Sequence, residues 1–559
     1  MSQPRENSAD VSAARRVQRL REASSNRFDL VVVGGGITGA GIANEASRRG
    51  LRVALLEAND YASGTSSRSS KLIHGGLRYL LTGDLGLVRK TARERKQIFK
   101  LAPHLAERRW MVIPAKTRAR LMQLRAGVTT YEKLGQVSAE DKHQRWLRPE
   151  LERNEPLLDR TRFPYACAYR EYVTDDARLV LANLRASARR GSIMLNEAPV
   201  EALIKEEGGQ VSGVRARCKL TGETFEVRGA LVVNAAGPWV DALQGMEDAS
   251  VRSNIHLAKG IHVVLPRERL PLDHLVVYEG RDGRHLFTVP RGDVVYLGTT
   301  DTSYQRGADL WPQITSEDIR YLLENIPAYF NTAPIEERDI VGAWAGLRAL
   351  VAEPGKRVSE ISRRDSVTVG AGGMVSVAGG KLTGYRFVAR DVVAKAAELT
   401  GVTLAEDVPH TPLPGGDFDG DLDGLAATLA SRFSVETEDA RRLVQLYGTE
   451  AEQVLELGTA RVSTRSRMLS GEIDWAVHSE AAHRVEDVIY RRARVALYEV
   501  DPRSAVEAVA DRMQALLGWD ARRRDDELSV VRNRLASDLA FGADSVYVGA
   551  AGQAAPAKG

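Results

Sequence analysis

The chain has 559 residues, of which 43% are hydrophobic and 27% are charged. This balance excludes fibrous and globally disordered proteins, and the length allows two or three domains with sizeable cores. Lys and Arg total 78 against 74 Asp and Glu. So small a basic surplus over this length argues against a nucleic-acid-binding protein.

The sequence contains two cysteines, Cys167 and Cys218, without a Cys-x-x-Cys spacing. We therefore expect neither an iron–sulfur cluster nor a cysteine-ligated zinc site, and no metal site is predicted.

No stretch approaches the roughly 18 uninterrupted apolar residues that span a bilayer, and the N-terminus lacks the apolar core of a secretory signal. We expect a protein kept on the cytoplasmic side, whose redox chemistry would require an organic cofactor.

Residues 27–57 predict a βαβ unit that binds a dinucleotide. The apolar run at 30–33 predicts a buried strand, the glycine-rich turn at 34–39 leads into an Ala-rich helix, and residues 52–56 predict a second strand. Such glycines make a tight turn and let the backbone approach a pyrophosphate, and an acid after the second strand binds a ribose. The predicted contacts are Gly34, Gly36, Ile37, Thr38, Gly39 and Glu57.

Strand-like runs at 230–234 and 262–265, with turn signals between them, predict a substrate domain interleaved with the cofactor domain. The run at 231–237 ends in small residues against which a cofactor can lie. We therefore add Ala235, Ala236 and Gly237 to the predicted cofactor contacts, and Val200 is also included among them.

The predicted fold class is α/β plus all-α. A Rossmann-like cofactor domain and its interleaved substrate domain occupy 27–405, and Pro- and Gly-rich residues 406–424 form a linker. Helical periodicity predicts a C-terminal helical domain at 425–545. Residues 1–26 are expected to be disordered or to form a short helix, and the tail at 546–559 to be disordered.

Four stretches resemble the FAD-dependent glycerol-3-phosphate dehydrogenases, two-domain flavoproteins related to the amino-acid oxidases. They are GTSSRSSKLIHGGLRYL at 64–80, KGIH at 259–262, GTTD at 298–301, and GLR at 346–348 together with GGKLTGYR at 379–386. The resemblance covers residues 28 to about 390. It implies an amino-acid-oxidase-like fold and FAD rather than a nicotinamide cofactor.

The hydroxyl-rich loop at 64–74 is suited to bind the pyrophosphate and the polar edge of the flavin ring. Glycines at 379–380 would let the backbone approach the flavin, beside a lysine that stabilises negative charge on the reduced ring or holds the substrate. The cofactor contacts predicted in these stretches are Thr65, Ser66, Ser67, Ser70, Lys71, Leu72, His74, Gly380, Lys381, Leu382 and Thr383.

The substrate implied by the resemblance is glycerol 3-phosphate. Its phosphate dianion requires several cations, and guanidinium groups match phosphate oxygens bidentately. Arg348 stands in a small and apolar context that favours a buried functional arginine, and Arg363 is followed directly by Arg364. The predicted substrate contacts are Arg78, Tyr79, Lys259, Arg348, Arg363, Lys381 and Tyr385.

Oxidation at carbon 2 needs a base that removes the hydroxyl proton while hydride leaves for the flavin. His74 and His262 are the two candidates, with His74 slightly favoured. Arg348 would stabilise the alkoxide-like charge, and Lys381 completes the predicted catalytic set.

Residues 114–128 mix basic and apolar side chains without an acid, and Arg108, Arg109 and Trp110 precede them. Segment 108–128 is therefore predicted to bind an anionic lipid surface, although a solvated basic helix has a similar composition. Together with the quinone acceptor that the resemblance implies, this predicts a peripheral protein on the inner face of the cytoplasmic membrane. The helical domain is expected to serve in packing or in forming a homodimer.

Three alternatives remain open at this point. A glycerol-3-phosphate oxidase would share every quoted motif and release hydrogen peroxide. A flavin oxidase of amino or hydroxy acids would need one arginine for a carboxylate rather than several cations. A non-catalytic flavin-binding protein would not need His74, Arg348 and Lys381 together.

Overall fold

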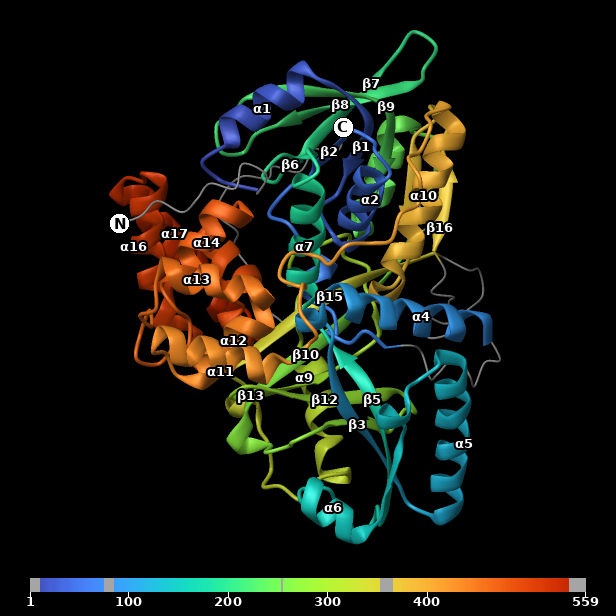
Figure 1. Ribbon diagram of the computed structural model, residues 1–559, viewed down its shortest axis with the longest axis vertical. Helices are drawn as coiled ribbons and strands as arrows, with labels where there is room; N and C mark the ends of the chain where they lie inside the picture. The colour runs from blue at the N-terminus through green and yellow to red at the C-terminus, as the bar shows by residue number, and fades with distance from the viewer. Residues whose placement is uncertain (1–10, 75–84, 253–254, 352–364, 542–559) are drawn as a thin grey trace.

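Two mixed β-sheets and a C-terminal helical domain make up the computed structural model, which describes residues 11–74, 85–252, 255–351 and 365–541 (Figure 1). Strands of the two sheets alternate along the chain. The predicted fold class, with its interleaved domains and its C-terminal helices, is confirmed.

The first sheet contains the predicted βαβ unit. Its strands run in the order β16-β17-β9-β1-β2-β6, and β8 joins β7 to β9. Strand β1 pairs in parallel with β2 and β9, as a βαβ crossover requires. The strands are β1 (Arg27–Val33), β2 (Val53–Leu56), β6 (Ile193–Leu195), β7 (Val200–Lys205), β8 (Val211–Arg217), β9 (Thr224–Asn234), β16 (Ser366–Val369) and β17 (Val375–Ala378).

Both faces of this sheet are covered, which explains the continuous apolar run in β1. Leu30 and Val32 pack with residues of α2 (Ile37–Arg48), α7 (Asp176–Ala188) and α10 (Tyr385–Thr400). Val31 and Val33 point to the other face and pack with β8 and with α1 (Arg16–Ser25). Alternate residues of a strand face opposite sides, so a strand buried on both faces must be apolar throughout.

The second sheet builds the substrate domain in the order β14-β10-β13-β12-β11-β3-β5-β4, with β15 on β10. Strands β10 and β15 pair antiparallel over ten registered residue pairs. The strands are β3 (Glu107–Ala115), β4 (Gln144–Trp146), β5 (Tyr165–Val173), β10 (Ile255–Pro266), β11 (Leu275–Glu279), β12 (His285–Arg291), β13 (Val294–Gly298), β14 (Thr302–Ser303) and β15 (Gly342–Val351). Helices around this sheet are α4 (Leu85–Leu101), α5 (Arg118–Gly135), α6 (Arg148–Asn154) and α9 (Ser316–Leu323).

Residues 401–421 contain neither helix nor strand and lead into the helical domain. Its helices are α11 (Leu422–Phe433), α12 (Thr437–Tyr447), α13 (Ala451–Leu457), α14 (Gly471–Glu480), α15 (Val495–Tyr498), α16 (Val506–Leu517) and α17 (Ala521–Ser537), with a π-helical turn, η11 (Asp487–Arg492), between α14 and α15.

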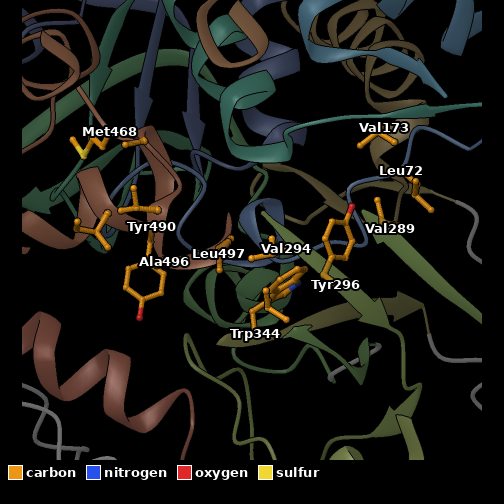
Figure 2. Close-up of a cluster of buried hydrophobic side chains, with 14 of the residues drawn as sticks. Leu72, Val173, Val289, Val294, Tyr296, Trp344, Met468, Tyr490, Ala496 and Leu497 are labelled. Atoms are coloured by element: carbon orange, nitrogen blue, oxygen red, sulfur yellow. The ribbon is translucent and has the colours of Figure 1, made fainter. Parts of the chain in front are cut away.

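The helical domain shares a hydrophobic core with the substrate sheet. Tyr490, Ala496 and Leu497 belong to the same buried cluster as Tyr296 and Trp344 (Figure 2). Within the described ranges, no helix is both long and apolar enough to cross a membrane. The tail predicted at 546–559 lies outside the described residues.

Candidate functional site

A large cavity of about 2540 Å³ is lined by both sheets and by the helical domain. Most ligand pockets measure roughly 300–1,000 Å³, so this cavity has room for a cofactor and a substrate together. Its wall includes the turn after β1, the loop at 62–74, the centres of β10 and β15, and the turn at 379–383.

The turn after β1 fits a pyrophosphate. Gly34 has φ +115°, and a side chain there would meet the carbonyl oxygen of Ala235 at 2.4 Å. A Cβ on Gly39 would lie 1.9 Å from the Gly34 carbonyl oxygen, so the turn and the start of α2 require glycine at both positions. Helix α2 thereby points its N-terminal backbone N–H groups into the cavity, where its Gly36, Ile37 and Thr38 contribute to the wall.

Glu57 lines the cavity at the end of β2. Its two carboxylate oxygens accept hydrogen bonds from the backbone N–H groups of Gly35 at 2.7 Å and Asn59 at 2.9 Å. Each oxygen retains a further lone pair for a ribose hydroxyl. Burial raises the pKa of Glu57, although both backbone hydrogen bonds oppose the shift.

The hydroxyl-rich loop is fixed against the turn and the second sheet. Ser66 Oγ accepts a hydrogen bond from the N–H of Ile37 at 2.9 Å, and Thr65 Oγ1 donates to the carbonyl oxygen of Leu347 at 2.6 Å. Ser66 therefore lies at the N-terminus of α2, where the phosphate groups of a dinucleotide bind. Ser70, Leu72 and Val200 also line the cavity, as do Ala236 and Gly237 beside Ala235.

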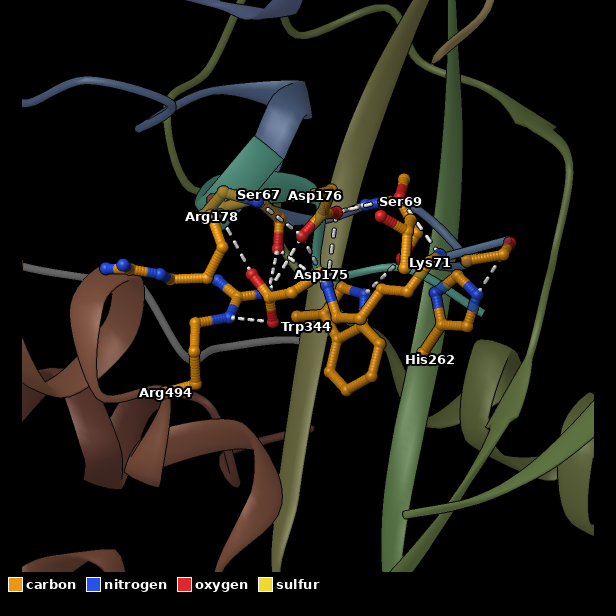
Figure 3. Close-up of polar contacts among 12 residues, drawn as sticks. Ser67, Ser69, Lys71, Asp175, Asp176, Arg178, His262, Trp344 and Arg494 are labelled. Atoms are coloured by element: carbon orange, nitrogen blue, oxygen red, sulfur yellow. Dashed lines mark hydrogen bonds and ion pairs between the residues drawn. The ribbon is translucent and has the colours of Figure 1, made fainter. Parts of the chain in front are cut away.

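A buried network of charges holds this loop from below (Figure 3). Lys71 Nζ lies 3.1 Å and 3.2 Å from the carboxylate oxygens of Asp176, and donates to the carbonyl oxygen of Ser67 at 2.9 Å. Arg494, at the start of α15, donates to Asp176 at 2.8 Å and to Asp175 at 2.9 Å. The helical domain thus contributes the guanidinium of Arg494 to the charge network that holds the hydroxyl-rich loop.

Burial and neighbouring charges compete in setting the pKa values of this network. It lowers the pKa of Lys71 to about 7, against the opposing charge of Asp176. Burial alone would raise the pKa of Asp175, but Arg494 and Arg291 outweigh it and hold that pKa below its ordinary value. Sequence reasoning assigned no role to Asp175, Asp176 or Arg494, because acids at the N-terminus of a helix are common and do not by themselves indicate a buried ion pair.

At the other end of the cavity, Arg348 of β15 extends across β10. Its guanidinium donates to the Thr300 carbonyl oxygen at 3.2 Å, to Asp301 at 3.1 Å and to Thr299 Oγ1 at 3.1 Å. A Cβ on Gly260 would meet the guanidinium at 2.3 Å, so glycine at that position makes room for it. Asp301 stands in a motif quoted above, but sequence reasoning did not recognise it as the partner of Arg348.

His262 lies in the wall beside Arg348 and stacks on Trp344, with ring centroids 4.9 Å apart. Its Nε2 lies 2.9 Å from Ser70 Oγ, and its Nδ1 has no hydrogen-bond partner among the described residues. Burial, reinforced by Lys71 and Arg348, lowers the pKa of His262 well below its ordinary value. The imidazole is therefore neutral at pH 7, and the same surroundings disfavour its protonated form.

His74, Lys381, Leu382 and Thr383 close the cavity from the side of the first sheet. Gly380 has φ +96°, a conformation that favours glycine. Thr383 Oγ1 donates to the carbonyl oxygen of His74 at 3.2 Å, which joins the two family-like stretches. Both candidate bases, Arg348 and Lys381 thus line one cavity.

Several predicted site residues do not line the cavity wall. Lys259 is buried in an ion pair with Asp318, 2.5 Å apart, and Tyr385 is buried under α2, where its hydroxyl accepts a hydrogen bond from Asn183 at 3.2 Å. Ser67 and Lys71 face the charge network instead of the cavity, and Gly39 packs against Gly34. Arg78, Tyr79 and Arg363 lie outside the described residues.

Comparisons with known proteins agree with this geometry. A family model for FAD-dependent oxidoreductases matches residues 29–386, and one for the C-terminal domain of alpha-glycerophosphate oxidase matches residues 408–524. Aerobic glycerol-3-phosphate dehydrogenase of Staphylococcus aureus (strain USA300) is 34% identical over 530 residues, which cover 91% of this chain and 94% of the relative.

Two solved structures are also similar. The glycerol-3-phosphate dehydrogenase from Bacillus halodurans, complexed with FAD, has a TM-score of 0.78 and 30% identity over 95% of this chain and 99% of its own. The L-alpha-glycerophosphate oxidase from Mycoplasma pneumoniae, at 19% identity and a TM-score of 0.51 over 70% of this chain and 98% of its own, shares the fold. The chain belongs to the FAD-dependent glycerol-3-phosphate dehydrogenase family, with FAD as its cofactor.

Proposed function

We propose that the protein oxidises sn-glycerol 3-phosphate to dihydroxyacetone phosphate and passes the electrons to a membrane quinone. The observation that carries this proposal is the combination of His262, Arg348 and Lys381 in the wall of one cavity with the dinucleotide turn. A neutral base, a guanidinium and an ammonium group suit a substrate that bears both a hydroxyl group and a phosphate dianion.

In the proposed reaction, His262 accepts the proton of the carbon-2 hydroxyl. FAD bound in the cavity would supply the acceptor for the hydride from carbon 2. Arg348 and Lys381 bind the anionic substrate and stabilise the alkoxide-like oxygen, and Asp301 holds the guanidinium of Arg348 in place.

The quinone acceptor is supported by helix α5. Its first turn exposes Arg118 and Arg120, and Met122 is 69% exposed. The same helix places Arg120 and Leu124 in the wall of the cavity that holds His262. A membrane-facing helix that borders the cavity would give a lipid-soluble acceptor a short path to the site.

The test is anaerobic bleaching of the flavin absorbance by glycerol 3-phosphate, followed by reoxidation with a quinone analogue or with air. Rapid reoxidation by quinone and slow reoxidation by air are expected. Rapid reoxidation by air would instead identify a glycerol-3-phosphate oxidase, and failure to bleach would refute the proposed substrate.

A further inference from the structure

Arg68 is a buried arginine without a carboxylate partner. Its side chain contributes to the cavity wall, and the residue is 6% exposed. Its guanidinium carbon lies 3.6 Å from the centroid of the Trp311 ring. Among the described residues, that stacking contact is its partner, and no side-chain hydrogen bond or ion pair is formed. A guanidinium group so deeply buried normally pairs with an anion, because burying an uncompensated charge is costly.

A second guanidinium stacks on the same indole. The guanidinium carbon of Arg534, in α17 of the helical domain, lies 3.8 Å from the Trp311 centroid. Two cations this close to one ring centre cannot occupy the same face, so Trp311 is sandwiched between them. Arg534 also lines the cavity. The two side chains therefore concentrate positive charge in one arm of the cavity, the part lined by Arg68, Trp311 and Arg534.

Two acids near this arm form hydrogen bonds with residues other than Arg68. Glu486 accepts a hydrogen bond from Arg491 at 3.1 Å, and Asp538 accepts one from the Tyr490 hydroxyl at 2.5 Å. Burial, followed by the charges of Arg534 and Arg491, lowers the pKa of Arg68 to about 9. The charges of Glu486 and Asp538 oppose this shift only in part, and neither carboxylate forms an ion pair with Arg68. The guanidinium therefore remains protonated at pH 7 without an ion-pair partner among the described residues, which leaves that place to an anion from outside the protein.

The position of Arg68 indicates the chemistry of that counterion. Arg68 follows Ser66 by two residues, and Ser66 accepts its hydrogen bond at the N-terminus of α2. The cavity is continuous from that terminus to Arg68 and Arg534. A phosphate oxygen pair matches the planar donor fork of a guanidinium and supplies the missing negative charge.

We propose that Arg68, stacked on Trp311 and assisted by Arg534, binds a phosphate group in this arm of the cavity. The group is either the pyrophosphate of FAD or a free phosphate that enters from solvent. The inference does not depend on the substrate or the acceptor proposed above, since FAD and inorganic phosphate serve as its probes.

The test uses full-length R68M and R68K. The apoprotein is titrated with FAD by fluorescence, and the holoenzyme is titrated with inorganic phosphate by calorimetry. Loss of a charge-assisted hydrogen bond predicts roughly ten- to hundred-fold weaker binding by R68M and a smaller loss in R68K. Weaker FAD binding identifies the pyrophosphate, and weaker phosphate binding identifies a free anion.

The thermal unfolding of the apoprotein separates binding from a structural role. Because Arg68 carries an uncompensated charge, apo R68M is expected to unfold at the same temperature as the wild type or higher. Both affinities within about twofold of wild type, or a lower unfolding temperature with unchanged affinities, would overturn the proposal. Exposed Arg306, in the same loop as Trp311, provides the control R306M, which should change neither affinity.

Discussion

His262, the proposed base, has a proton affinity that is set by its surroundings. It is 2% exposed, stacked on Trp344 and close to two cations, so its charged form is disfavoured. A general base must be neutral before it acts, and burial keeps this imidazole neutral below pH 6.5. His74 lines the same cavity, and the sequence alone slightly favoured it.

We predict that H262N lowers kcat by about 10²–10⁴-fold, the usual contribution of a positioned base. FAD affinity should stay near the wild-type value, because the loss concerns proton transfer. The measurement is the rate of flavin bleaching by glycerol 3-phosphate in a single anaerobic turnover. H74N is the matched comparison, and a loss of this size in H74N alone would assign the base to His74.

The sequence motifs predicted which segments form the site more reliably than they predicted which side chains of those segments face the cavity. The turn at Gly34 was predictable because strand, glycines, helix and acid follow one another locally. Lys259 and Tyr385 also stand in family-like stretches, yet neither lines the cavity wall. Neighbouring residues of a strand or helix point in different directions, so motif membership alone does not establish contact with a ligand.

At the scale of elements, helix α5 combines a basic first turn with an exposed Met122. We predict that R118S/M122S weakens binding to vesicles containing anionic lipid by five-fold or more, since one cation near such a surface contributes about 1 kcal/mol. Cosedimentation with vesicles measures this effect. R503S, which removes an exposed cation from the helical domain, is the control. Equal binding by R118S/M122S and wild type would exclude α5 as the lipid contact.

The helices of the C-terminal domain follow from local periodicity, but their docking does not. Arg491 and Arg492 both bond to Asp60, and Arg494 bonds to Asp175 and Asp176. These partners are separated by hundreds of residues in the chain, and any surface arginine has a similar local signature. The pairing of distant charges therefore required the three-dimensional structure.

We predict that R494M destabilises the protein by about 3–5 kcal/mol, because two buried carboxylates lose a guanidinium partner. The hydroxyl-rich loop should become more mobile at the same time, since Arg494 also donates to the carbonyl oxygen of Ser67 at 3.3 Å. Thermal unfolding and the fraction of FAD retained after gel filtration measure both effects. R494K, which keeps the charge, should lie between R494M and wild type. Wild-type stability and FAD content in R494M would contradict this role.

For the whole molecule, His104 links stability to pH. It is 4% exposed and packs against Gly448 of the helical domain, and its Nδ1 has no hydrogen-bond partner among the described residues. Burial, followed by the charge of Arg178, lowers the pKa of His104 to about 3. Between that value and about 6.5, the unfolded chain binds a proton that the folded protein does not. His104 therefore lowers the free energy of unfolding as the pH falls below 6.5.

We predict that H104Q makes the pH dependence of unfolding shallower. The slope between about pH 5 and pH 6 should decrease by about 1.4 kcal/mol per pH unit, which corresponds to one proton. Urea unfolding of wild type and H104Q at these two pH values measures the difference. Parallel pH profiles for the two proteins would show that His104 titrates normally in the fold.

The charge network that holds the hydroxyl-rich loop also constrains the order of folding and cofactor binding during synthesis. The ribosome synthesises Ser67 early, whereas its partner Arg494 emerges only with the last domain. Until then, Asp175 and Asp176 lack the guanidinium of Arg494, and the loop lacks one of its anchors. FAD should therefore be captured firmly only after translation is nearly complete, and a truncated nascent chain should be released without its cofactor.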